Sequence, residues 1–194
     1  MKSMLIPALL VATSIALATS GCSKKDDDTT KTTAATDTAT PADTGTPTAA
    51  APAADSHAAQ FLTDAIRGDN AEIKAGQAAQ SMGSSQGVKD FGKMLVDDHT
   101  KARDQASQVA TAMNVPVPSD TPPEADKDLK MTMGMSGAGF DKDFIAMEVK
   151  DHKNDIAKFE AEAKSSDPSQ VTDLAKQTVP VLKKHLQTAQ SLQK

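Results

Sequence analysis

Residues 86–114, QGVKDFGKMLVDDHTKARDQASQVATAMN, decide the fold class of this chain. Apolar side chains recur in this stretch every three or four residues, which is the spacing of one face of an α-helix. That face carries Val88, Phe91, Leu95, His99, Ala102, Ala106, Val109 and Met113. Pro116 and Pro118 follow, and proline disrupts a helix. We therefore expect a long amphipathic helix that ends near residue 114.

Three other stretches have the same periodicity, at about residues 57–80, 141–163 and 168–192. Short links follow the first and the third of the four predicted helices, and a connection of about 25 residues separates the second from the third. Four amphipathic helices with one long crossover predict an all-α fold. We expect a ferritin-like four-helix bundle over residues 58–194, with the crossover between its second and third helices.

The amino terminus, residues 1–21, has the composition of an export signal. A basic Lys2 precedes an apolar run that is too short to span a membrane. The run closes with Thr19-Ser20-Gly21-Cys22, which resembles the lipobox of bacterial lipoproteins, where the cysteine is lipidated and becomes the new terminus. We expect lipidation of Cys22. The alternative is an ordinary secretory signal, cut near the same place, that leaves a free thiol.

Lipidation of Cys22 would attach the protein to a membrane, because more than one acyl chain gives stable anchoring. Ser23 follows the cysteine, whereas an Asp there would retain an enteric lipoprotein at the inner membrane. We expect an outer-membrane lipoprotein that faces the periplasm, with a soluble periplasmic protein as the alternative. Residues 22–57 are predicted to be a disordered linker, because residues 23–55 hold 10 Thr and 9 Ala but no Leu, Ile, Val, Phe or Met.

Composition excludes several classes of function. A net charge of -5 and the absence of Trp and Tyr argue against binding to nucleic acid, which needs a basic surface and stacking rings. A single Cys cannot build a disulfide framework or a cysteine-rich metal site. No nucleophile elbow, phosphate-binding loop or dinucleotide fingerprint is present. An enzyme is therefore the less favoured interpretation, and only a metal-dependent redox reaction stays open.

Three histidines lie on the apolar faces of three different predicted helices. His99, His152 and His185 are near the middle of their helices, and Glu72 has the same position on the first. Since the midpoints of bundled helices share one level, these side chains should converge, and Glu148 is one turn before His152 and in position to join them. This set suits one Zn, Cu, Fe or Mn ion. The alternative is a buried polar network without metal.

The pattern differs from that of ferritin-type di-iron sites, which use Glu-x-x-His on two helices. The residues three places before the histidines are Val96, Val149 and Leu182, so a ferroxidase is not expected. Asp98 and Asp151 each directly precede a histidine and lie about 100° around the helix from it. We expect these two carboxylates to be solvated or to support a ligand rather than to bind an ion directly.

The long connection contains three methionines close together. Met131, Met133 and Met135 have the soft thioether sulfurs with which exported proteins hold Cu(I), which makes them a candidate soft-metal loop. The favoured alternative is that they fill irregular gaps under the crossover. His57, next to the linker, is expected to be exposed.

The chain resembles a bacterial family known as domain of unknown function 4142. The resemblance is carried by Phe61, Glu72 and Gly76, by Val88-Lys89-x-Phe91 through Asp98-His99, by Ser136-Gly137-x-x-Phe140-Asp141 and His152, and by Pro180-x-Leu182-x-x-His185. It implies a ferritin-like bundle on an exported or membrane-tethered protein, with characteristic positions at Glu72, His99, His152 and His185. It implies no established activity. We expect a metal-binding domain, or else a metal-free structural or interaction module with a protein partner in the cell envelope.

Overall fold

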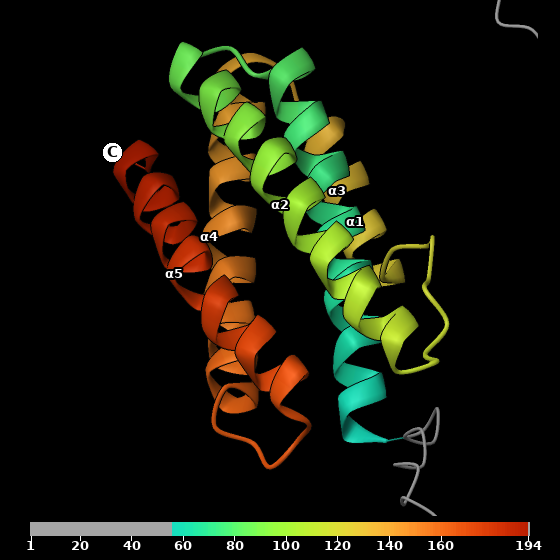
Figure 1. Cartoon of the computed structure of the whole chain (residues 1–194). Helices are drawn as coiled ribbons and strands as arrows, with labels where there is room; N and C mark the ends of the chain where they lie inside the picture. The colour runs from blue at the N-terminus through green and yellow to red at the C-terminus, as the bar shows by residue number, and fades with distance from the viewer. Residues whose placement is uncertain (1–55, 194) are drawn as a thin grey trace, which may run out of the picture. The chain divides into compact units, whose positions relative to one another are not determined.

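Five α-helices make up residues 56–193, the part of the chain that the computed structural model describes (Figure 1). They are α1 (His57–Met82), α2 (Gln86–Ala112), α3 (Pro123–Met133), α4 (Gly137–Glu162) and α5 (Ser169–Leu192). These residues contain no strand, so the predicted all-α bundle is confirmed. The predictions for residues 1–55, the lipidation of Cys22 among them, lie outside the described residues.

Local sequence explains where the first two helices begin and where α2 ends. The Ser56 and Ser85 hydroxyls accept hydrogen bonds from the backbone N–H groups of Ala59 and Val88, and so satisfy donors that have no partner within the helix. Asn114, just beyond α2, has a φ of 57°, a left-handed conformation that asparagine tolerates at helix ends. Helix α2 is therefore closed before Pro116 is reached.

Helix α3 is a fifth helix that lies inside the predicted crossover. Pro123 begins it, and Glu124 and Asp126 lie in its first turn, where negative charge is favourable. Only Leu129 and Thr132 are buried, so its apolar face is too narrow to produce a clear periodicity in the sequence. The helix carries the chain back along the bundle, so that α2 and α4 run in the same direction (Figure 1).

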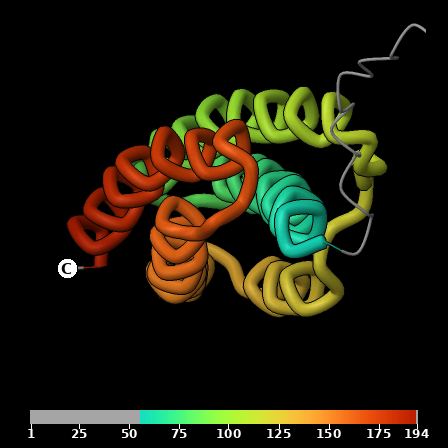
Figure 2. The backbone as a smooth tube through the Cα atoms, turned by 60° about the horizontal axis from the view of Figure 1, so that its bottom comes forward, coloured from blue at the N-terminus to red at the C-terminus, as the bar shows by residue number. Residues whose placement is uncertain are grey.

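The helices are arranged as two closely packed antiparallel pairs, α1 with α2 and α4 with α5 (Figures 1 and 2). Helix α2 also packs on α5, and α3 lies beside α1 and α4. None of the helices in residues 56–193 has an apolar stretch long enough to cross a bilayer.

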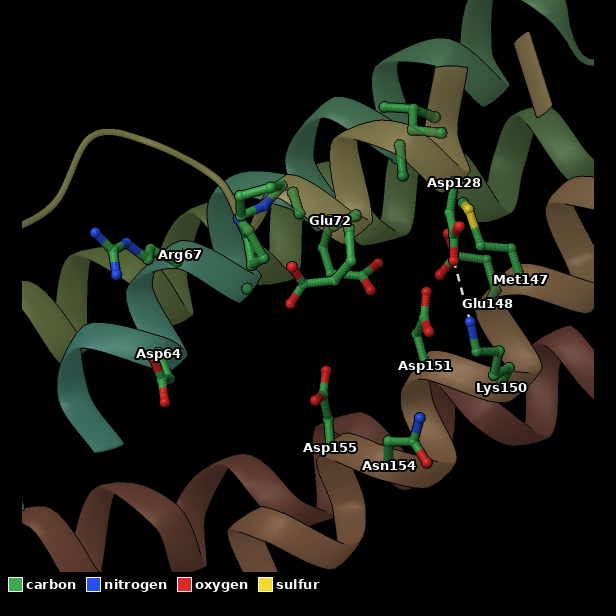
Figure 3. Close-up of a pocket in the computed structure, with 18 of the residues that line it drawn as sticks. Asp64, Arg67, Glu72, Asp128, Met147, Glu148, Lys150, Asp151, Asn154 and Asp155 are labelled. Atoms are coloured by element: carbon green, nitrogen blue, oxygen red, sulfur yellow. Dashed lines mark hydrogen bonds and ion pairs between the residues drawn. The ribbon is translucent and has the colours of Figure 1, made fainter. Parts of the chain in front are cut away.

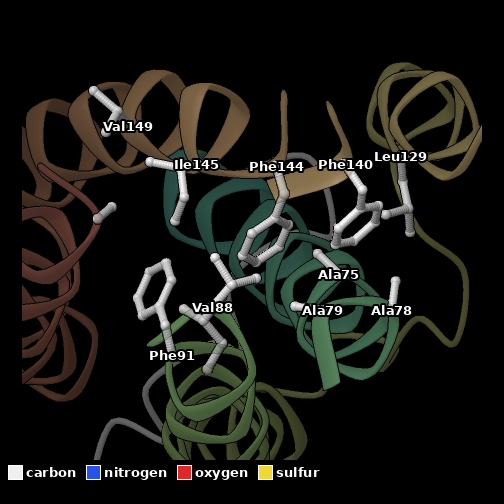
Figure 4. Packing of buried hydrophobic residues seen from close by; sticks show 12 residues of the cluster. Ala75, Ala78, Ala79, Val88, Phe91, Leu129, Phe140, Phe144, Ile145 and Val149 are labelled. Carbon is white, nitrogen blue, oxygen red and sulfur yellow. The ribbon is translucent and has the colours of Figure 1, made fainter. Parts of the chain in front are cut away.

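The apolar core consists of two separate clusters. One includes Phe91, Phe140 and Phe144, with the rings of Phe140 and Phe144 stacked at a centroid distance of 5.8 Å (Figure 4). The other includes Leu62 and Ile66 of α1, together with side chains from the last turns of α2 and the first turns of α5. Along α1, the first cluster begins at Ala75 and the second ends at Ile66, so the middle of the bundle lies between them.

Helices α1 and α2 approach each other closely at Gly76 and Gly92. A Cβ atom at Gly92 would lie 2.6 Å from the Gly76 carbonyl oxygen and 2.7 Å from the Cβ of Ala79. At this crossing only glycine lets the two backbones come so near without a shift.

We expect Gly92→Ala to lower the free energy of unfolding by about 1–3 kcal/mol, because the added methyl group overpacks the α1–α2 crossing. The matched control is Gly68→Ala in α1, where a Cβ would meet no atom within 4 Å. Alanine favours helix there, so the control should be neutral or stabilising by up to about 1 kcal/mol. Urea unfolding measures both, and equal stability of the Gly92→Ala variant and the parent would contradict the prediction.

Asp141, just after the first turn of α4, holds the α1–α2 connection. Its carboxylate accepts hydrogen bonds from the Ser84 N–H (2.7 Å), the Ser84 hydroxyl (2.8 Å) and the Ser85 N–H (2.8 Å). Burial works against ionisation of Asp141, but these donors outweigh it and lower the pKa of the carboxyl below its usual 3.8.

Asp141→Ala should destabilise the bundle by about 1–2 kcal/mol at neutral pH, because the charge-assisted hydrogen bonds are lost. A carboxyl whose pKa is lowered by folding contributes stability above its unfolded pKa and loses it as the pH falls through the folded one. The difference between parent and variant should therefore be full well above pH 3.8 and shrink below it. Thermal unfolding against pH measures this, with Asp143→Ala, an exposed neighbour, as control. A difference independent of pH would refute it.

Candidate metal centre

The three histidines predicted to converge do lie together at the middle of the bundle. One ring nitrogen from each of His99, His152 and His185 lies within 4.8 Å of one from each of the other two. The ring centroids are 5.1–5.8 Å apart, and all three side chains are buried. They come from α2, α4 and α5, so the site exists only when the two helix pairs are docked.

Each histidine has one ring nitrogen in contact with an oxygen acceptor of the protein. The pairs are His99 Nδ1 with Asp69 Oδ1 (2.8 Å), His185 Nε2 with Asp98 Oδ2 (3.0 Å) and His152 Nδ1 with the backbone carbonyl of Glu148 (3.0 Å). Since carboxylate and carbonyl oxygens only accept, these nitrogens carry the hydrogens and donate them. When the rings are neutral, the second nitrogen of each has a free lone pair, which is the arrangement of metal-binding histidines.

The remaining nitrogens face one another. His152 Nε2 lies 3.2 Å from His185 Nδ1, and two lone pairs at this distance repel unless a proton or a cation lies between them. Two nitrogen ligands of one tetrahedral ion, with bonds of about 2.0–2.1 Å, are about 3.3 Å apart. His99 Nε2 is buried and has no hydrogen-bond partner. The separation of the nitrogens thus fits two ligands of a shared ion.

Two carboxylates lie beside the histidines. Glu72 of α1 and Glu148 of α4 form a group with His152 in which the candidate ligand atoms are within 4.8 Å of one another. Glu72 Oε2 and both carboxylate oxygens of Glu148 are buried without a hydrogen-bond partner. An ionised carboxylate is costly to bury unless a positive charge compensates it. All five residues that the sequence singled out are therefore brought together.

The electrostatics of the centre keep its groups in different protonation states. Burial raises the pKa of Glu148 well above its ordinary value, and the charge of Glu72 raises it further. Burial also opposes ionisation of Glu72, but positive charge on His152 and His99 outweighs it and lowers the pKa of Glu72. Burial lowers the pKa of His185 to about 4, so its imidazole is neutral at pH 7, as metal binding requires.

Asp69 is a component of the centre that sequence reasoning missed. It lies on α1 one turn before Glu72, is 7% exposed, and bonds to His99. Burial lowers the pKa of His99, but Asp69 and Glu72 outweigh this effect and raise it. The only signal in the sequence was a second acid at i, i+3 spacing on the buried face of α1. Asp98 supports His185, which agrees with its predicted role beside a histidine.

A pocket of about 630 Å³ lies between α1, α3 and α4 and is lined by Glu72 and Glu148. Asp151 and Asp155 project into it from α4, and Asp128 faces it from α3 (Figure 3). Burial and the charge of Glu72 raise the pKa of Asp151 to about 6. Carboxylates outnumber basic groups on its walls, and such a field attracts cations.

A second pocket, of about 320 Å³, reaches the centre from the end at which α1 begins. It is lined by Asp69, Glu72 and His99 and also by His57 and Glu162. The centre is therefore bordered by two pockets along α1, although its own side chains are buried.

The three methionines of the candidate soft-metal loop lie at the end of α3. Met131, Met133 and Met135 are 58%, 46% and 45% exposed. They do not fill gaps beneath the crossover, so that interpretation of the motif is wrong. Binding of Cu(I) by this segment stays a prediction.

Comparison with known proteins identifies the family but adds no chemistry. A family model described as "Domain of unknown function (DUF4142)" matches residues 43–192, a range that contains all five helices. No curated protein and no solved structure matches the chain. The ferritin-like relationship that the resemblance implied stays a prediction. The match extends over most of the sequence, and on that ground the chain belongs to the family of domain of unknown function DUF4142.

Proposed function

We propose that this domain binds a divalent transition-metal ion between His99, His152 and His185, with Glu72 or Glu148 as a further ligand. The observation that carries the proposal is the set of buried atoms without a partner: His99 Nε2, Glu72 Oε2 and both oxygens of Glu148. The candidate ligand atoms form two groups that share His152, one with His99 and His185 and one with Glu72 and Glu148, and within each group the atoms lie within 4.8 Å of one another. A cation among the three histidines would give His99 Nε2 a partner and offset the charge of the adjacent carboxylates.

A metal-free polar network explains these contacts less well. A proton shared by His152 Nε2 and His185 Nδ1 would relieve their repulsion, and a proton on Glu148 would pair it with Glu72, but His99 Nε2 would still lack a partner. Each buried polar group that lacks a partner costs about 1–3 kcal/mol. A cation bound by the histidines would remove this cost at His99 Nε2 and would also offset the negative charge beside it.

The ligand set indicates the class of ion. Three imidazoles with one carboxylate suit Zn, Fe, Cu or Mn, whereas Ca and Mg prefer oxygen ligands alone. The candidate ligands are at most 8% exposed. A buried site of this kind favours holding an ion over turning over a substrate, so we propose a role in metal homeostasis or protection.

The first experiment measures the metal content of the full-length chain, purified without chelator and then passed through a weak chelator. About one ion per chain should remain in the parent and none after His99, His152 and His185 are all changed to Ala, since each supplies a ligand. Because replacing three buried side chains can unfold the bundle, the single variants His152→Gln and Glu148→Gln are measured beside it. Glu160→Gln is the matched control, since Glu160 pairs with Lys183 and lies outside the centre.

A second measurement tests the same site without relying on variants. Adding the bound metal to chelator-treated protein should raise the melting temperature, since an ion at a hundredfold excess over its dissociation constant stabilises by about 2.7 kcal/mol. If Zn, Cu, Fe and Mn all leave the melting temperature of the parent unchanged, the proposal fails. The metal-free envelope module, with a protein partner, would then be the better interpretation.

We further propose that the domain is held at the outer membrane by lipidated Cys22. The support is sequence alone: the apolar run up to Leu17, the lipobox-like residues 19–22, and the linker that follows. In an enteric host, the parent should fractionate with the outer membrane and Cys22→Ala should be released as a soluble periplasmic protein. Ser23→Asp is the matched variant and should move the protein to the inner membrane. Equal fractionation of Cys22→Ala and the parent would show that lipid does not anchor the protein.

A further inference from the structure

The end of the bundle at which α1 begins carries a second group of side chains that could serve as metal ligands. His57 is the first residue of α1, Glu162 the last of α4, and Asp167 lies in the connection to α5. His57 Nδ1 is 2.7 Å from Asp167 Oδ2 and 3.4 Å from Glu162 Oε2. Three elements that are distant in sequence therefore place a nitrogen and two carboxylate oxygens around one point.

Glu162 is the residue that a simple ion pair does not explain. Its side chain is 1% exposed, and its Oε1 accepts a hydrogen bond from the Ser165 hydroxyl at 3.0 Å. Its Oε2 is buried without a hydrogen-bond partner and faces His57. The single hydrogen on His57 Nδ1 is directed to Asp167, which is nearer, so it does not also satisfy Glu162.

The spacing of the three atoms fits a cation. Neighbouring ligands of a tetrahedral ion with bonds of about 2.0–2.2 Å lie about 3.3–3.6 Å apart, which the 3.4 Å between His57 Nδ1 and Glu162 Oε2 matches. The 2.7 Å between His57 Nδ1 and Asp167 Oδ2 is a hydrogen-bond distance, which would widen once an ion replaced the hydrogen. His57 is 71% exposed, so an ion would reach this group directly from solvent. Asp167 is 18% exposed and lies at the same surface.

The group formed by His57, Glu162 and Asp167 lies beside the pocket that reaches the central histidines. His57 and Glu162 line the same pocket of about 320 Å³ as His99 and Glu72. We infer that His57, Glu162 and Asp167 form a second site for a divalent transition-metal ion, at the mouth of the pocket that leads to His99. The site itself stands on its own geometry, whereas its role as an entrance rests on the proposed function of the centre.

The test is a Zn²⁺ titration of the full-length, chelator-treated chain, followed through the imidazole nitrogen signals in NMR spectra. The chain has four histidines, so the His57 ring can be observed separately. The parent should bind one ion that shifts the His57 signal, and His57→Ala and Glu162→Gln should each lose that ion. Glu160→Gln, a half-buried neighbour on α4 that pairs with Lys183, is the matched control and should keep it. A His57 signal unmoved by Zn²⁺ overturns the proposal.

Whether the surface site acts as an entrance is tested by the rate at which the central site takes up metal. In His57→Ala the central site should fill several-fold more slowly with Co²⁺, followed by absorption, and should reach the same final occupancy. Equal rates in parent and variant overturn the entrance role.

The two proposals also fail in different ways. If the central histidine variants bind as many ions as the parent while His57→Ala loses one, the proposed function is wrong and the surface site stands. If only the central variants lose an ion, the surface site is wrong.

Discussion

The free energy of burying imidazole and carboxylate groups at the middle of the bundle is the constraint on which the rest of the structure depends. Asp69, Glu72, His99, His152 and His185 occupy a level that a bundle of this size would ordinarily fill with apolar side chains. Burying them is tolerated because two apolar clusters, one on either side, supply the favourable burial that the centre lacks. The hydrogen bonds to the outer nitrogens of the histidines then fix the direction of each ring.

That constraint also requires that the helices keep their register relative to one another. The contact of Gly76 with Gly92 fixes the depth at which α1 meets α2, and the bonds of Asp141 to Ser84 and Ser85 fix the start of α4 against their connection. Residues on four different helices meet at the centre, so a slip of one helix by a single turn, about 5.4 Å, would dismantle it. The register of the helices is thus set at positions outside the centre itself.

Much of this could be predicted from the sequence, for reasons that particular residues make clear. His99, His152 and His185 interrupt strongly periodic apolar faces near helix midpoints, so their convergence follows from the geometry of a bundle. Helix α3 could not be predicted, because Leu129 is the only apolar residue that it buries. The role of Asp69 was also hidden, because an acid in an Ala-rich helix has the same appearance in the sequence whether it faces solvent or an imidazole.

The separation of the core into two apolar clusters has a consequence for how such proteins diverge. Leu62 and Ile66 belong to one cluster and Phe140 and Phe144 to the other, and none of these four lies among the candidate metal ligands. The residues that stabilise the fold are therefore largely distinct from those that determine its chemistry. Descendants of one ancestral bundle can therefore exchange a histidine or a glutamate at the middle while they inherit the same scaffold.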